Sequence, residues 1–232
     1  MTEIRQALVI FAKAPEHGKV KTRLVPPLSF SQATELYRCF LRDTIENVTQ
    51  LGGVDVIISY TPKGKEYLFE EIAPGYKLML QEGDSFGPRL FSCFQKLFSA
   101  GYSSVCVMDT DSPTLNKEFL AEGFSVLAKH DDSAVIGPSE DGGYYVIGLR
   151  KVHREMFEGI TWSTEKVTAE SLRQAKSINL TVHLLPTWFD VDTGADLIRL
   201  AAGVCNGRAT GYDAAHTRAL LESFTLELAE SA

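Results

Sequence analysis

Short apolar runs alternate with longer segments of helical periodicity along most of this chain. A continuous apolar run of about 4–8 residues is typical of a buried strand, and apolar residues recurring every three or four positions are typical of an amphipathic helix. The strand-like runs occupy residues 7–11, 54–60, 77–80, 104–108, 133–136, 144–149 and 180–185. The helix-like segments occupy residues 30–51, 65–72, 90–98, 116–129 and 165–177, and two further helices begin near 194 and 213.

This alternation predicts an α/β protein with a mainly parallel sheet and helices on both faces. Of the 232 residues, 44% are hydrophobic, which is enough for a sizeable core. No repeat, low-complexity segment or linker interrupts the pattern, so we expect one domain over residues 1–232. In sheets of this kind, ligands bind outside the carboxyl ends of the strands. The loops that follow the strands are therefore the first places to look for functional residues.

The charge balance narrows the set of partners. The 23 basic and 30 acidic residues give a net charge of −7, which argues against binding to nucleic acid or to an anionic membrane. A phosphate-bearing ligand would then need a local basic patch or a metal ion. No apolar stretch approaches the roughly 20 residues of a membrane span, and the amino terminus shows no signal-peptide pattern. The four scattered cysteines form no CxxC pair, so we expect reduced thiols and a cytoplasmic protein.

Two aspartates, Asp109 and Asp111, follow the apolar run 104–108 directly. Residues i and i+2 of an extended backbone point the same way, so both carboxylates can converge on one point. Two like charges about 5 Å apart repel by roughly 3 kcal/mol at an effective dielectric constant near 20. A divalent cation, Mg²⁺ or Mn²⁺, carrying a phosphate group would relieve that repulsion. The alternative is a turn in which Asp111 caps the next helix, but that alternative leaves Asp109 without a role.

A basic loop follows the first strand. Its four cations are Lys13, Lys19, Lys21 and Arg23, with Gly18 among them. Lysine offers a point charge and arginine a two-pronged donor to diphosphate oxygens, so the loop suits a phosphate ligand. It is not a P-loop, because no glycine precedes the Gly-Lys pair at the required distance. A solvated basic loop without a ligand is the alternative.

The loop 137–143 pairs two acids, Glu140 and Asp141, with two glycines, Gly142 and Gly143. Adjacent glycines let the backbone approach a ligand closely, and a carboxylate there could act as a general base. Asp141 is the better candidate for the base because the glycines adjoin it. A tight turn explains the same residues equally well.

Two further segments carry candidate ligand contacts. Trp162 could stack on a sugar or a base, or it could be a buried residue before a helix capped by Ser163 or Thr164. The segment 189–193 repeats the spaced-aspartate pattern, and Asp192 is a candidate metal ligand with helix capping as the alternative. The five histidines show no ligand spacing, and none is assigned to a metal.

Together these motifs resemble a family of small bacterial transferases, formerly of unknown function, that is associated with glycosyl transfer in arsenosugar biosynthesis. The resemblance spans about residues 7–200, and its motifs are 11–15 with 18–24, 109–113, 140–145, 162–164 and 190–193. That family lies in the nucleotide-diphospho-sugar transferase superfamily, which has the GT-A fold. The resemblance implies that Asp109 and Asp111 match the Asp-x-Asp motif that holds Mn²⁺ or Mg²⁺ on the donor diphosphate.

The same landmarks are also similar to guanylyltransferases that act on 2-phospholactate and to nucleotidyltransferases of molybdenum-cofactor synthesis. Those enzymes share a Lys-x-Arg-Leu stretch, here 21–24, and an Asp-x-Asp-Thr stretch, here 190–193. The resemblance therefore leaves open whether a glycosyl or a nucleotidyl group is transferred. A non-catalytic nucleotide-binding module is a third alternative.

Our leading hypothesis is a metal-dependent glycosyltransferase that moves a sugar from a nucleotide-diphospho-sugar to a small acceptor. Asp141, supported or replaced by Glu140, would be the base. The expected metal ligands are Asp109, Asp111 and Asp192, and the expected donor contacts are Lys13, Lys19, Lys21, Arg23, Gly142, Gly143 and Trp162. The nucleotide base, the sugar, the acceptor and the oligomeric state stay open at this point.

Overall fold

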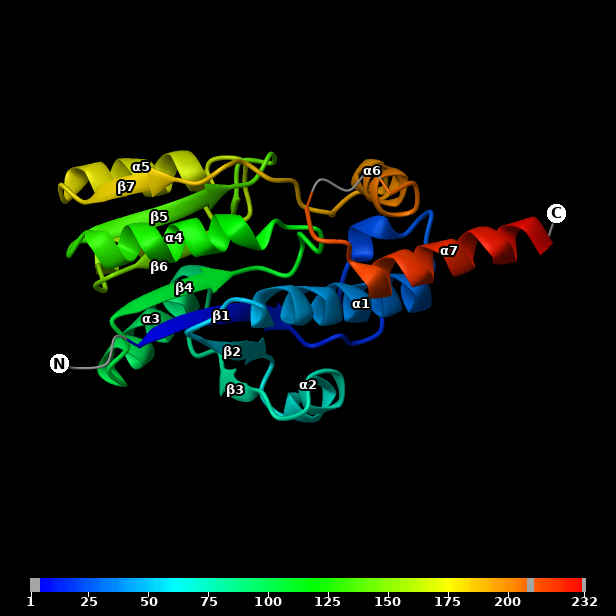
Figure 1. The fold of residues 1–232 in the computed structure, drawn as a ribbon, viewed down its shortest axis with the longest axis horizontal. Helices are drawn as coiled ribbons and strands as arrows, with labels where there is room; N and C mark the ends of the chain where they lie inside the picture. Colours follow the sequence, from blue (N-terminus) through cyan, green and yellow to red (C-terminus); the bar gives the residue numbers. More distant parts are fainter. Residues whose placement is uncertain (1–4, 208–210, 231–232) are drawn as a thin grey trace.

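The computed structural model describes residues 5–207 and 211–230, and its centre is a twisted sheet. Over these residues the sheet has seven strands in the order β3-β2-β1-β4-β6-β5-β7 (Figure 1). The strands are β1 (Gln6–Lys13), β2 (Val54–Thr61), β3 (Lys77–Leu80), β4 (Ser104–Met108), β5 (Ser133–Pro138), β6 (Tyr144–Leu149) and β7 (Thr181–Leu184). All neighbouring pairs are parallel except those that β6 makes with β4 and β5.

Helices cover both faces of the sheet because alternate strand residues point to opposite sides. On β1, Leu8 and Ile10 pack towards α1 (Phe30–Thr49), α2 (Glu66–Ile72) and α4 (Lys117–Lys129). Ala7 and Val9 pack on the other side, towards α3 (Phe86–Ser99) and α5 (Val167–Ser177). All five residues of β4, the central strand that ends at Asp109, are buried.

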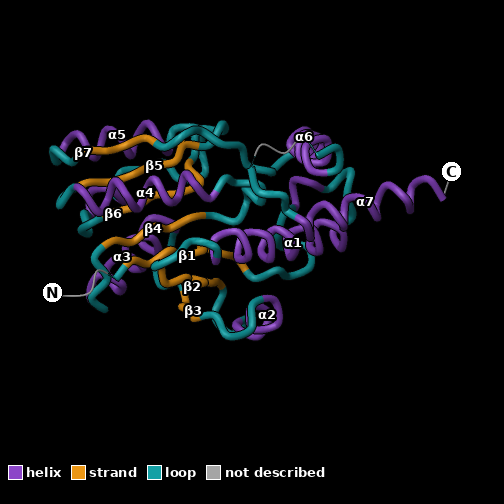
Figure 2. Tube along the Cα trace, viewed as in Figure 1, coloured by secondary structure: helices purple, strands orange, loops and turns teal. Residues whose placement is uncertain are grey.

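A third apolar cluster lies beyond the carboxyl ends of the strands. It joins the far side of α1 to the short helix η1 (Thr22–Leu24), to α6 (Gly194–Val204) and to α7 (Ala215–Glu230). Figures 1 and 2 show α6 and α7 at the side of the molecule away from the sheet, with α1 extending from the sheet towards them. Leu24, Phe40 and Val191 are fully buried in this cluster. The cluster therefore fixes the basic loop and the segment 190–193 against the same helix, α1.

Because β6 is antiparallel to its neighbours, the loop that precedes it lies at the edge of the sheet where the other strands end. The Asp109 N–H donates to the Tyr145 carbonyl oxygen at 3.0 Å, next to the β4–β6 pairing. The loop 139–143 therefore lies at the same edge as the end of β4. In a purely parallel sheet, residues just before a strand would lie at the opposite edge.

The expected α/β fold with a mainly parallel sheet is confirmed. The prediction did not include the short 3-10 helices, η1 and η2 (Arg154–Phe157). In the part of the chain that the structure describes, no helix is both long and apolar enough to cross a bilayer.

Candidate functional site

A cavity of about 690 Å³ opens at the carboxyl edge of the sheet, where β1 and β4 end and β6 begins. Its volume is in the range of small-molecule sites. Five aspartates line it: Asp109, Asp111, Asp141, Asp190 and Asp192. Four cations from the basic loop line it as well: Lys13, Lys19, Lys21 and Arg23. The structure thus brings the aspartate motifs and the basic loop into one site.

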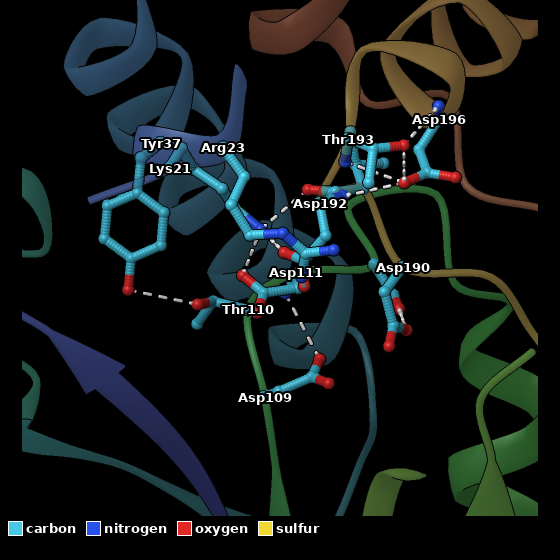
Figure 3. A network of polar contacts seen from close by, with 12 residues as sticks. Lys21, Arg23, Tyr37, Asp109, Thr110, Asp111, Asp190, Asp192, Thr193 and Asp196 are labelled. Atoms are coloured by element: carbon cyan, nitrogen blue, oxygen red, sulfur yellow. Dashed lines mark hydrogen bonds and ion pairs between the residues drawn. The ribbon is translucent and has the colours of Figure 1, made fainter. Parts of the chain in front are cut away.

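Asp109 and Asp190 form the inner pair of carboxylates (Figure 3). Burial raises the pKa of Asp109 well above its usual range, and the negative charges of Asp190 and Asp111 raise it further. Burial also raises the pKa of Asp190, to about 7, although hydrogen bonds from Ser139 and Ser112 favour the charged form. Those two hydroxyls donate to Asp190 Oδ1 at 2.9 Å and 3.1 Å. Without a cation, the inner pair therefore resists carrying two negative charges.

Asp111 and Asp192 form the outer pair, and Lys21 lies between them (Figure 3). The Lys21 Nζ atom lies 2.6 Å from Asp111 Oδ1 and 3.0 Å from Asp192 Oδ1. Burial would lower the pKa of this ammonium, but the charges of Asp111 and Asp192 outweigh it and raise the pKa above its ordinary value. The outer pair is therefore neutralised by a lysine from the basic loop.

Local backbone geometry aims Lys21 at the outer pair. Lys21 has a left-handed conformation, with φ of 46°, immediately before η1. That turn buries Leu24 in the third apolar cluster, which anchors the loop against α1 and α6. Arg23 also contacts Asp192, with 3.3 Å between Nη1 and Oδ2, but its side chain is 68% exposed. Arg23 thus keeps donors available to a ligand, and Lys21 does not.

A buried tyrosine ties the basic loop to the end of β4. The Tyr37 hydroxyl accepts hydrogen bonds from the Lys13 N–H and from the Thr110 hydroxyl, both at 3.1 Å. Burial raises the pKa of Tyr37 to about 12, so the phenol stays protonated at neutral pH. The first residue of the basic loop and the middle residue of the Asp-x-Asp motif consequently share one anchor.

Asp141 lines the cavity, and its Oδ1 accepts the Gly143 N–H at 2.8 Å. Gly142 has a φ of 90° and lies against the backbone of Glu165, since an added Cβ would stand 2.2 Å from the Glu165 carbonyl oxygen. Neither Gly142 nor Glu140 lines the cavity. The Glu140 carboxylate instead makes a two-pronged ion pair with Arg199 on α6, at 2.5 Å and 2.9 Å. Glu140, which the sequence allowed to support or replace Asp141 as the base, therefore lies outside the cavity.

Aromatic side chains form the remaining wall. The ring centroid of Phe86 lies 5.7 Å from that of Phe11 and 5.0 Å from that of Trp162, and Tyr144 stands edge-on to Trp162. All four side chains line the cavity. Gly87 allows this packing, since a Cβ there would lie 2.6 Å from the indole nitrogen of Trp162. Trp162 lines the cavity, and its stacking on a ligand stays a prediction.

The helices α4 and α6 are capped by residues other than the aspartates of the two motifs. The Asn116 side chain caps α4 by accepting the Glu118 N–H at 3.0 Å, so Asp111 is not that cap. Thr193 caps α6 in a capping box with Asp196. The α5 helix begins at Val167 after Lys166, so the expected cap at Ser163 or Thr164 was wrong. This leaves the carboxylates of Asp111 and Asp192 available for the cavity.

Arg89, in the first turn of α3, is a cation outside the basic loop. Its Nε atom donates to the Gly83 carbonyl oxygen at 3.0 Å, and the residue does not line the cavity.

Asp190 is the residue that sequence reasoning undervalued. Its signal was present, because it belongs to the second spaced-aspartate pattern, but only the fold shows that it lies beside Asp109.

A second acidic cluster lies away from the cavity, where Asp43, Glu46 and His216 come close enough to hold a metal ion. Asp43 accepts the N–H groups of His216 and Thr217 at 3.0 Å and 2.8 Å, and the Thr217 hydroxyl at 2.6 Å. These contacts join α1 to the start of α7, so helix anchoring explains them. His216 and Asp43 are far apart in the chain, and no spacing pattern could have revealed the cluster.

Comparison with known proteins agrees with this fold. Residues 44–164 match the family described as "Uncharacterized protein conserved in bacteria (DUF2064)". A search of curated proteins finds no match. A crystal structure from Desulfovibrio desulfuricans G20, provisionally assigned as a nucleotide-diphospho-sugar transferase, is 32% identical over 95% of this chain and 98% of its own, with a TM-score of 0.84.

More distant structures share the fold alone. CMP:2-keto-3-deoxy-manno-octonic acid synthetase, complexed with CTP, is 12% identical over 88% of this chain and 99% of its own, with a TM-score of 0.54. The 4-diphosphocytidyl-2C-methyl-D-erythritol synthase of Anaerococcus prevotii is 16% identical over 85% and 94%, with the same TM-score. By the family match and the 32% identical relative, the chain belongs to the bacterial DUF2064 family, within the nucleotide-diphospho-sugar transferase superfamily that its motifs resemble.

Proposed function

We propose that this protein is a metal-dependent glycosyltransferase that moves a sugar from a nucleotide-diphospho-sugar to a small acceptor. The coarser statement, a transferase that uses a nucleotide substrate, is supported by the fold and its neighbours. The observation that carries the finer proposal is the inner pair, Asp109 and Asp190, in a cavity that is also lined by the four cations of the basic loop. Such a site suits a diphosphate held between a cation and positive side chains.

The donor set fits Mg²⁺ or Mn²⁺. Both ions prefer carboxylate oxygens, and the raised pKa values of Asp109 and Asp190 indicate that the surrounding protein does not stabilise their charged forms, as a bound cation would. Asp109 and Asp190 would hold the ion, with Asp111 and Asp192 directed to Lys21 instead. A divalent ion bound there supplies charge neutralisation for a departing nucleoside diphosphate.

The chain's own residues complete the site. Lys19 and Arg23 have exposed side chains, 61% and 68%, and can donate to the diphosphate oxygens from the basic loop. Trp162 offers an apolar face on which a sugar ring can stack. Asp141 lies across the cavity and can accept the proton of an acceptor hydroxyl. The acceptor oxygen then bonds to the sugar carbon as the bond from that carbon to the phosphate oxygen breaks.

The test is incubation of the protein with a panel of nucleotide-sugars and Mn²⁺, with nucleoside triphosphates in parallel. We expect slow release of nucleoside diphosphate and free sugar, since water can replace a missing acceptor. Asp141→Asn should retain donor binding in a thermal-shift assay and lose turnover. Absence of binding by every nucleotide-sugar, with the protein folded, would refute the proposal.

Nucleotidyl transfer is the second candidate. It is favoured by the meeting of the Asp109 and Asp190 motifs at one point, because that reaction commonly uses carboxylates from two segments. In this case a phosphorylated acceptor attacks the α-phosphorus of a nucleoside triphosphate, and pyrophosphate leaves. Release of pyrophosphate in the same panel would select this candidate over the first.

A further inference from the structure

The surroundings of the Lys21 ammonium account for its whole bonding capacity. Three oxygen atoms lie within 3.0 Å of Nζ: Asp111 Oδ1 at 2.6 Å, the Val191 carbonyl oxygen at 2.8 Å and Asp192 Oδ1 at 3.0 Å. A lysine ammonium has three N–H donors and no acceptor. The side chain is only 5% exposed, and the Phe40 ring lies 5.6 Å away on another side. With two hydrogen bonds, an ion pair to Asp111 and almost no exposed surface, Lys21 is closed off from a phosphate, contrary to its expected role as a donor contact.

The oxygen set around Nζ is also one that a cation would take. Two carboxylate oxygens and one backbone carbonyl oxygen are the ligand types of hard divalent ions. Each of the two aspartates comes from a motif that the sequence assigned to metal binding. The ammonium thus stands where the Asp-x-Asp pattern led us to expect an ion.

We propose that Lys21 takes the place of a second divalent cation at the outer pair, so that the site binds one ion, at Asp109 and Asp190. This inference rests on the proposed function for the presence of that one ion. It assigns Asp111 and Asp192 to holding Lys21, and it makes Lys21 a residue that sets how many ions bind. With one ion, the two-metal form of nucleotidyl transfer lacks its second cation, and departure of a diphosphate needs only one.

The first experiment counts bound Mn²⁺ by calorimetry and by electron paramagnetic resonance, without substrate. We expect one ion per chain in the wild type and two in Lys21→Met, which keeps the length of the side chain and removes its charge. The extra ion should be lost again in Lys21→Met/Asp192→Asn. Lys19→Met, an exposed lysine of the same loop, is the matched control and should keep the wild-type number. An unchanged number in Lys21→Met would overturn the inference.

A second variant serves in case Lys21→Met does not fold. Asp192→Asn leaves Lys21 in place, so the wild-type ion should bind with a dissociation constant changed by less than about threefold. If Asp192 were a metal ligand, the affinity would fall about tenfold or more, since even partners of ligands have effects of that size. That larger loss would overturn the inference.

The two proposals fail in different ways. The difference in ion number between Lys21→Met and the wild type tests the role of Lys21. The wild-type number itself tests the metal dependence: no bound ion would contradict the proposed function, and two bound ions would contradict only the inference on Lys21. Asp109→Asn, which should abolish the wild-type ion, shows which pair holds it.

Discussion

The inner and outer pairs of aspartates differ in one neighbour. Asp109 and Asp111 come from one loop, Asp190 and Asp192 from another, and each loop contributes one residue to each pair. The outer pair contacts Lys21, and the pKa of that ammonium is raised. The inner pair has only hydroxyl and backbone donors, and the pKa of both carboxyl groups is raised. The two pairs thus consist of the same residue type at the same spacing, but only the outer pair has a cation in contact with it.

This difference teaches that an Asp-x-Asp pattern does not by itself specify two metal ligands. Which of its carboxylates is free for an ion depends on a lysine that is adjacent only in the folded chain. Because the spacing i and i+2 sends both side chains to one edge, a single ammonium can neutralise one and leave the other. The following predictions test whether the two pairs differ in function and in stability.

The largest effect is expected from Asp109→Asn. Removing one inner carboxylate removes an oxygen ligand with its charge, and turnover should fall by about 10²-fold or more. Asp111→Asn is the matched variant at the outer pair and should lose about tenfold or less, because Asp111 contacts Lys21. Steady-state kinetics with saturating Mn²⁺ measures both. Equal losses would mean that the two pairs do not differ in function.

Lys21→Met should destabilise the metal-free protein. Removing one partner of a fully buried ion pair costs about 3–5 kcal/mol, and here both carboxylates are 35% exposed, so we expect about 2 kcal/mol. Urea unfolding measures this loss in the free energy of unfolding. Lys19→Met, on the exposed side of the same loop, should stay within about 0.5 kcal/mol of the wild type. A similarly small loss in Lys21→Met would show that the outer pair does not need its cation.

Asp43→Asn tests a carboxylate that is stabilised by hydrogen-bond donors and not by a cation. Asp43 accepts hydrogen bonds from two N–H groups and one hydroxyl at the start of α7, and losing the charge should cost about 1–2 kcal/mol of stability. Mn²⁺ binding should not change. A lower ion number in Asp43→Asn would instead place an ion at the cluster of Asp43, Glu46 and His216.

A pH dependence of stability is also expected without metal. The pKa of Asp190 is raised from 3.8 to about 7 in the folded protein. Between those values the folded protein holds a proton that the unfolded chain has released, so the free energy of unfolding should fall as the pH rises through this window. Lys21, whose pKa is raised above 10.5, adds no slope there. Urea unfolding at about pH 5 and about pH 8 should show a shallower slope in Asp190→Asn. An unchanged slope would assign the effect to other groups.

Most of the fold could be predicted because it depends on local patterns. Strands β3, β4 and β6 have the bounds that their apolar runs indicated, residue for residue. Each of these runs is flanked by turn residues or charges, which mark its ends. The start of α5 was placed too early because Ser163 adopts a positive φ of 63°, a conformation that no pattern of apolar residues reveals.

The site could be predicted only in part. The sequence identified the loops that meet at the cavity, because strand ends gather at one edge. It did not predict the pairing of Lys21 with Asp192, which lies 171 positions further along the chain. That contact depends on the third apolar cluster, which holds η1 and α6 against α1. Glu140 and Asp141 are sequence neighbours, yet only Asp141 lines the cavity, since Glu140 binds Arg199.

Gly142 sets how closely the loop that carries Asp141 approaches a neighbouring segment of the chain. Its bare α-carbon lets the loop that carries Asp141 rest directly on the backbone of Glu165, three residues after Trp162. Even one methyl group would drive these two stretches of chain apart and widen the gap between the carboxylate and the indole. The absence of a side chain at position 142 therefore sets the spacing between these two stretches of chain.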